Sequence, residues 1–226
     1  MSTLCLVYGT QIFAQDVLVA AASDLAPLVS ELQSGQSVKL RFSIGSSGQL
    51  ARQIENGAPF DIFLSADDGL INGSPNFRAE TVRVYALGRV ALWSKSGGFK
   101  RLEDLRRAKR IAIANPAHAP YGRAAREILE KAGLWAALTS RIVFAESVRQ
   151  AMQYAETGNV DAVLTSWSLV HERGGVLLDG AELRQTAAVT KSAKNVEGAQ
   201  KFLDFFLSEA GRTILARHGL TPPRKR

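Results

Sequence analysis

Hydroxyl-bearing residues and glycines follow several apolar runs of this chain, and together they could donate hydrogen bonds to an anion. Ser23 follows the run VLVAAA, and the run RFSI is followed by GSSG at residues 45–48, which includes Ser47. The corresponding places farther along the chain hold Pro120, Tyr121, Glu146, Ser147, Val148, Thr165 and Ser166. Small and hydroxylated residues at these places leave backbone N–H groups open to a ligand.

The chemistry that such residues favour is the solvation of an oxyanion by neutral donors. A helix start offers unpaired N–H groups and about half a positive charge, and a serine there adds a hydroxyl. Hydrogen bonds to a charged acceptor contribute ~1.5–3 kcal/mol each, so several converging donors can hold a dianion without a counter-charge. For each serine taken alone, helix N-capping is the alternative interpretation.

The elements that must position these residues alternate between strand and helix, which predicts an α/β fold. Strands are expected at residues 17–22, 38–42, 61–65, 82–93, 111–114, 142–145, 160–165 and 187–190. Helices are expected at 25–32, 48–55, 121–131, 148–156, 196–207 and 208–218. In open parallel sheets ligands gather beyond the carboxyl ends of the strands, where the hydroxyls stand.

The order of strand, small-residue turn and helix recurs on both sides of a midpoint near residue 92. Two half-sheets joined by two crossing strands would leave a cleft between two lobes. We expect one lobe from residues 15–90 plus 187–226 and the other from 91–186. A single doubly wound sheet is the other arrangement consistent with the pattern.

Composition and charge describe an ordinary globular protein of 226 residues that is 46% hydrophobic, with a net charge of +7 and a pI near 9.8. The Lys and Arg residues are mostly dispersed, and the two clusters, at 106–110 and 224–226, are typical of a helix end and a frayed terminus. Because no nucleic-acid-binding motif accompanies the charge, we expect no nucleic-acid partner.

The N-terminal residues 1–14 are apolar and end in a small residue before Gln15 and Asp16. This is similar to the second half of a secretory signal without its basic start, so we interpret it as a truncated leader and expect a periplasmic protein. The segment also contains Cys5, the single cysteine of the chain. A mature chain without cysteine has no thiolate metal site and no cysteine nucleophile.

The sequence gives little support to two other functions, catalysis and the binding of a free metal ion. The sequence has no G-x-S-x-G elbow, no S-x-x-K pair and no P-loop. We expect His118, His171 and His218 to be polar surface or capping residues, although a serine hydrolase remains an alternative. Asp67 and Asp68 are expected in a solvated turn, so we predict no free metal ion and no cofactor.

Several phrases in combination resemble one family, the molybdate-binding periplasmic proteins of ABC transporters. They are VLVAAASDLAPLV, GSSGQLARQIENGAPFDIFLSAD, YALGRVALW, IAIANPAHAPYGRAA, ESVRQAM and KFLDFFLSEAGRTILARHGL. The resemblance implies a type II periplasmic-binding-protein fold, with two lobes that are each a mixed, mainly parallel sheet flanked by helices and a ligand cleft between them.

The same resemblance implies the ligand residues. Hydroxyls and amides of Ser23 and Ser47 would come from the first lobe, and backbone N–H groups of Tyr121 and Val148 from the second. Thr165 stands where many members of the family have a tyrosine whose hydroxyl reaches the anion, so its shorter side chain would contact the ion less directly.

We therefore expect a monomer that binds molybdate or tungstate through oxygen atoms and delivers the anion to a membrane permease. Sulfate, phosphate and a small organic anion remain alternatives within the same class. Phosphate keeps a proton near neutral pH and favours a site with an acceptor, whereas sulfate and molybdate carry no proton and require donors alone. Asp24 is either such an acceptor or an acidic residue of a first helical turn.

Overall fold

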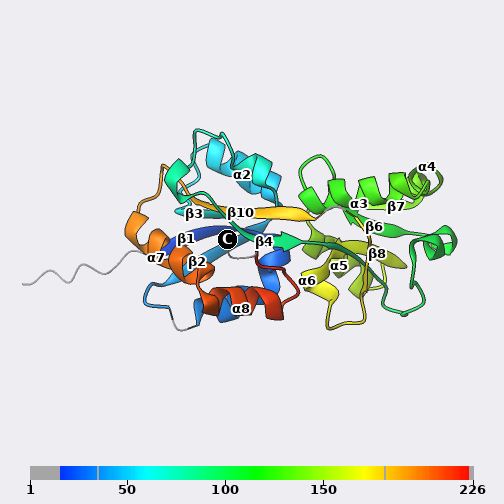
Figure 1. Cartoon of the computed structure of the whole chain (residues 1–226). Helices are drawn as coiled ribbons and strands as arrows, with labels where there is room; N and C mark the ends of the chain where they lie inside the picture. Colours follow the sequence, from blue (N-terminus) through cyan, green and yellow to red (C-terminus); the bar gives the residue numbers. More distant parts are fainter. Residues whose placement is uncertain (1–15, 35, 181, 224–226) are drawn as a thin grey trace, which may run out of the picture.

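The structure, a computed structural model, describes residues 16–34, 36–180 and 182–223 and contains two separate five-stranded sheets side by side (Figure 1). The strand orders are β2-β1-β3-β10-β4 in the first sheet and β7-β6-β8-β5-β9 in the second. Two sheets exclude a single doubly wound sheet and confirm the two-lobed α/β prediction. The predicted leader remnant at residues 1–14 lies outside the described residues.

The first sheet is mixed. Strand β1 (Val17–Ala22) pairs in parallel with β2 (Leu40–Gly45) and with β3 (Ile62–Ser65). Strand β10 (Leu183–Val189) lies antiparallel between β3 and β4 (Arg83–Gly88). The carboxyl ends of β1, β2 and β3 therefore meet at one edge, the edge that faces the second sheet in Figure 1.

The second sheet repeats this plan. Strand β6 (Ile111–Ala114) pairs in parallel with β7 (Ile142–Ala145) and with β8 (Ala162–Ser166). Strand β5 (Val90–Trp93) pairs antiparallel with β8 and with β9 (Val176–Leu177). The two sheets thus present equivalent strand ends toward each other.

Helices cover both faces of each sheet (Figure 1). With the first sheet lie α1 (Val29–Gln33), α2 (Ser47–Glu55), α7 (Val196–Leu207) and α8 (Glu209–Arg217). With the second lie α3 (Pro120–Lys131), α4 (Trp135–Leu138), α5 (Val148–Glu156) and α6 (Trp167–Val170). Short 3-10 helices are η1 (Ser23–Leu28), η2 (Asp68–Leu70), η3 (Ala79–Thr81), η4 (Leu102–Arg107) and η5 (Thr139–Arg141). We call each sheet with its helices the first unit and the second unit.

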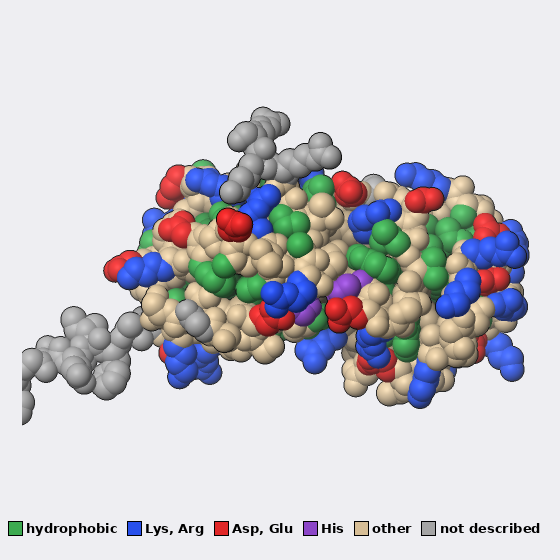
Figure 2. Space-filling model, turned by 60° about the horizontal axis from the view of Figure 1, so that its bottom comes forward, with side chains coloured by type: hydrophobic (Ala, Val, Ile, Leu, Met, Phe, Trp, Pro, Cys, Tyr) green, Lys and Arg blue, Asp and Glu red, His purple; other side chains and the backbone are tan. Residues whose placement is uncertain are grey.

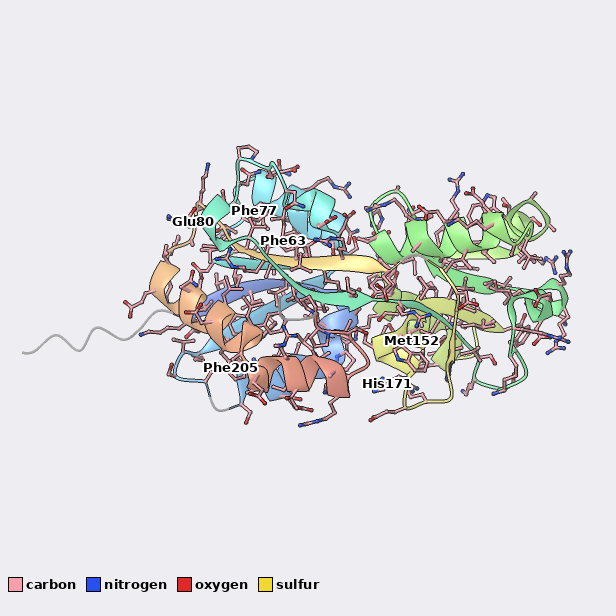
Figure 3. The ribbon with its side chains drawn as sticks, viewed as in Figure 1. Phe63, Phe77, Glu80, Met152, His171 and Phe205 are labelled. Atoms are coloured by element: carbon pink, nitrogen blue, oxygen red, sulfur yellow. The ribbon has the colours of Figure 1, made fainter. Side chains whose placement is uncertain are left out.

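Each sheet has a hydrophobic core on both faces, which explains why central strands such as β1, β3, β6 and β8 are largely apolar runs rather than alternating ones. In the first unit, Phe63 of β3 stacks on Phe77 with ring centroids 5.8 Å apart (Figure 3). On the opposite face Phe202 of α7 is fully buried. In the second unit, Met152 of α5, labelled in Figure 3, packs on one face of the sheet. Ile128 of α3 belongs to the core on the other face.

The chain crosses between the units twice, through Gly88 and Arg89 and again between β9 and β10. The strand predicted at 82–93 is therefore two strands that belong to different sheets. The strand predicted at 187–190 begins earlier, because the polar residues Arg184 and Gln185 belong to β10. The residue boundaries that we predicted for the lobes stay a prediction.

The helix predicted at 25–32 is divided into η1 and α1. Pro27 lies inside η1 and has no N–H to donate, so a regular α-helix does not form across it.

The surface is charged but mixed, with basic and acidic side chains interspersed on the face in Figure 2. Within the described ranges, no helix combines the length and apolar character needed to span a bilayer.

Candidate functional site

A buried cavity lies between the two units, at the edge where their strand ends meet. The first unit lines it with Ala22, Ser23, Asp24, Ser46, Ser47 and Ala66, and the second with Ala119, Pro120, Tyr121 and Val148. The cavity is small, with an empty volume of about 200 Å³ that includes space open to solvent. The structure thus brings together Ser23, Ser47, Tyr121 and Val148, four of the five residues predicted from the sequence.

Three helices begin at this cavity. Ser47 is the first residue of α2, Val148 is the first residue of α5, and Tyr121 is the second residue of α3 after Pro120. Among the described residues, no carbonyl accepts a hydrogen bond from these three N–H groups. No Lys or Arg lines the cavity. Any positive potential that the lining contributes therefore comes from helix starts, which suit an anion held by neutral donors.

The hydroxyl of Ser47 is set up to donate. Its Oγ accepts a hydrogen bond from Ala66 N at 2.9 Å, which leaves its own proton for another acceptor. The N-cap of α2 is instead Ser46, whose Oγ accepts from Gln49 N. The capping interpretation therefore holds for Ser46 and not for Ser47. The hydroxyl of Ser23 is also uncommitted, because it makes no hydrogen bond to another described residue.

Thr165, the fifth predicted residue, is not among the residues that line the cavity. It is fully buried at the end of β8, and its Oγ1 donates to the carbonyl of Val148 at 3.2 Å. Through that bond it supports the start of α5, from which the Val148 N–H points. Direct contact of Thr165 with a ligand stays a prediction.

Asp24 is a cavity residue that sequence reasoning left undecided. Tyr121 Oη donates to Asp24 Oδ2 at 3.0 Å, and Gln185 Nε2 lies 2.6 Å from the same oxygen. Burial raises the pKa of the Asp24 carboxyl, although these two hydrogen bonds oppose the shift. Burial and the Asp24 charge hold the pKa of Tyr121 well above its usual range, so the phenol is a donor. No sequence signal pointed to Gln185, which is 161 positions from Asp24.

The two units touch beside the cavity through α2 and the loop before α3. The N–H of Gly48 donates to the His118 carbonyl at 3.0 Å, and Ser46 Oγ lies 3.0 Å from His118 Nδ1. A Cβ at position 48 would lie 2.4 Å from that carbonyl oxygen, so only glycine permits this approach. The prediction of His118 as a surface or capping residue is wrong, because it is buried in this contact.

Two further pairs join the units. Gln49 Nε2 donates to Glu146, and the Arg123 guanidinium of α3 pairs with Asp67. The turn at Asp67 was predicted to be solvated. Asp67 instead has a partner in the opposite unit, and Asp68 pairs with Arg184 at 3.0 Å. The contacts thus place the structure in a closed form.

Ser46, His118 and Glu146 form a series that resembles a serine hydrolase triad in residue type. Here Nδ1 of His118 faces the serine, and Nε2 lies 3.5 Å from the Glu146 carboxylate. In hydrolase triads the ring faces the opposite way, with Nε2 toward the nucleophile. Ser46 Oγ is also occupied as the N-cap of α2. The series therefore acts as a contact between units, and the described residues contain no group of three side chains able to hold a metal ion.

Comparisons with known proteins agree with this geometry. A family model described as bacterial extracellular solute-binding protein matches residues 11–221. The molybdate-binding protein ModA of Azotobacter vinelandii is 31% identical, with 91% of this chain and 90% of that protein covered. A ModA of Rhodobacter capsulatus is 30% identical over 96% of this chain and 94% of that protein. The solved structure of an Azotobacter vinelandii periplasmic molybdate-binding protein is similar at a TM-score of 0.86 with 26% identity, covering 92% of this chain and all of that one.

Proposed function

Because the chain belongs to the family of bacterial extracellular solute-binding proteins, we propose that it binds molybdate or tungstate in the cavity between its units. It would act as a monomer outside the cytoplasmic membrane and deliver the anion to the permease of an ABC transporter. The names of the relatives support the choice of ligand, and the cavity supports the mode of binding. Ser23, Ser47, Tyr121 and Val148 are the proposed ligand residues.

One observation carries the proposal: three helix starts and two hydroxyls with protons available to donate converge on a cavity that no Lys or Arg lines. Each donor to a charged oxygen contributes ~1.5–3 kcal/mol. Ser47 and Ser23 contribute from the first unit, and the N–H groups of Tyr121 and Val148 from the second. A tetrahedral ion between them links the two units, so closure and binding favour each other.

The test is calorimetric titration of the purified chain with molybdate, tungstate, sulfate and phosphate. Tight binding of molybdate and tungstate with weak binding of the other two would support the proposal. Binding of sulfate or phosphate in preference would keep the mode of binding and replace the ligand. If none of the four anions releases or absorbs heat, the proposed function is wrong.

A substitution of Thr165 distinguishes direct contact of this residue with the anion from a role in positioning α5. We expect Thr165→Val to lower the free energy of unfolding by about 1 kcal/mol, because the hydrogen bond to the Val148 carbonyl is lost. The affinity for molybdate should fall by less than about fivefold, since Val148 keeps its own N–H. Thermal unfolding and titration measure the two quantities. A large loss of affinity at unchanged stability would show that Thr165 contacts the anion.

A further inference from the structure

Asp24 has one carboxyl oxygen with two partners and one with none. Oδ2 accepts from Tyr121 Oη and from Gln185 Nε2, which also lies 2.9 Å from that phenol oxygen. Oδ1 is buried and has no hydrogen-bond partner in the structure. A buried oxygen without a partner is costly and calls for an explanation in a native fold. A proton on Oδ1 would turn an unpartnered acceptor into a donor.

The surroundings of Asp24 offer hydrogen bonds to its carboxyl group but no positive charge. The titratable groups that interact with it are two phenols, Tyr121 of α3 and Tyr85 of β4, and neither carries a positive charge. Gln185 of β10 is neutral, and Ser168 of α6 donates to the main-chain oxygen of Asp24 at 2.7 Å. Among the described residues, no Lys, Arg or His forms an ion pair with Asp24. A bound dianion in the same cavity would add repulsion.

Much of this burial comes from contact between the units. Asp24 belongs to the first unit, whereas Tyr121 and Ser168 belong to the second. Gly88, on the segment that crosses between the units, leaves space for the side chains of Tyr121 and Gln185 beside Asp24. A Cβ there would lie 2.2 Å from Tyr121 Oη and 2.5 Å from Gln185 Nε2. Separation of the units would withdraw Tyr121 and Ser168 and admit water to the Asp24 carboxylate.

We propose that Asp24 takes up a proton on Oδ1 when the units close on the anion, so that binding is coupled to the uptake of about one proton. The proton comes from solvent, an O–H bond forms, and the carboxylate becomes a neutral acid. This inference rests on the proposed function and names a proton-dependent control of the same site. The raised pKa of the buried carboxyl agrees with it.

The sign of the pH dependence follows from the order of the two states. In the open form the solvated carboxyl has the lower pKa, and in the closed form the buried carboxyl has the higher one. Between these two values closure binds a proton, so the affinity falls as pH rises, by up to about tenfold for each pH unit. Below the lower value Asp24 is protonated in both forms, and the dependence disappears.

The test is calorimetric titration of the full chain with sodium molybdate, from about pH 5 to about pH 9, in pairs of buffers with different ionisation enthalpies. Wild type should take up about one proton per anion within part of this range. Asp24→Asn should take up none and bind with an affinity that does not change with pH. Its amide oxygen can accept from Tyr121 and Gln185, and its NH₂ replaces the protonated Oδ1. Asp204→Asn, an exposed change on α7, should behave as wild type.

The outcomes separate the two proposals. Molybdate binding by wild type without proton uptake overturns the role of Asp24 and leaves the proposed function standing. Proton uptake that persists in Asp24→Asn assigns the proton to another group and also overturns it. If neither protein binds any of the four anions, the proposed function itself is wrong. Molybdate binding by wild type without proton uptake would overturn the role of Asp24 even if Asp24→Asn does not fold.

Discussion

Ser47→Ala is expected to weaken molybdate binding by about ten- to a hundredfold, because a donor to a charged oxygen contributes ~1.5–3 kcal/mol. The hydroxyl of Ser47 accepts from Ala66 N, so its proton is available to the anion. The same substitution leaves the Ala66 N–H unpaired, and we expect the free energy of unfolding to fall by about 1–3 kcal/mol. Titration and thermal unfolding measure the two effects separately.

Ser208→Ala is the matched control for this loss of stability. Ser208 caps α8 far from the cavity, where its Oγ accepts from Gly211 N. The change should cost about 1 kcal/mol of stability and leave the affinity unaltered. Equal affinities of Ser47→Ala and wild type would remove Ser47 from the ligand shell.

Gly48→Ala is expected to reduce affinity without loss of stability. A Cβ at 48 would lie 2.4 Å from the His118 carbonyl oxygen, so the units cannot close as they do here. Overpacking of ~1–3 kcal/mol in the closed form alone corresponds to about a five- to hundredfold weaker affinity. Position 48 lies in the first turn of α2, where alanine is the better helix former by up to about 1 kcal/mol. The melting temperature should therefore be unchanged or higher.

The control for Gly48→Ala is the same substitution at a position with open space. At Gly98 the nearest atom to an added Cβ is Ser96 Oγ at 3.4 Å, which is ordinary contact. Gly98→Ala should leave affinity unchanged. Small-angle scattering with saturating molybdate should show the Gly48 variant more extended than wild type. A compact, tight-binding Gly48 variant would contradict the assignment of this contact to closure.

The sequence predicted the elements whose signals are local. The strands Ile111–Ala114 and Ile142–Ala145 and the helix Val148–Glu156 have the predicted bounds. Each of these strands is an apolar run between polar residues, and the helix begins directly after its N-cap Ser147. Four of the five predicted site residues line one cavity for a related reason, since strand ends in both units meet at one edge.

The elements that depend on distant contacts were not predictable. Strand β10 contains Gln185, a polar residue that is fully buried because Asp24 and Tyr121 are its partners. His118 has no local pattern that predicts burial, and its partner Ser46 is 72 positions away. Asp24 similarly has the position of a first-turn acid, and its burial follows from how the two units close.

The contacts that hold the units together, that of Gly48 with His118 among them, also bear on how long a bound ion would stay. All the residues that line the cavity are buried, so we expect an ion inside to leave for bulk solvent mainly when the units separate. Its residence time would then follow the frequency of opening rather than the strength of any one donor. A membrane component that holds the units apart would unload the ion within a single opening, without touching a residue that binds it.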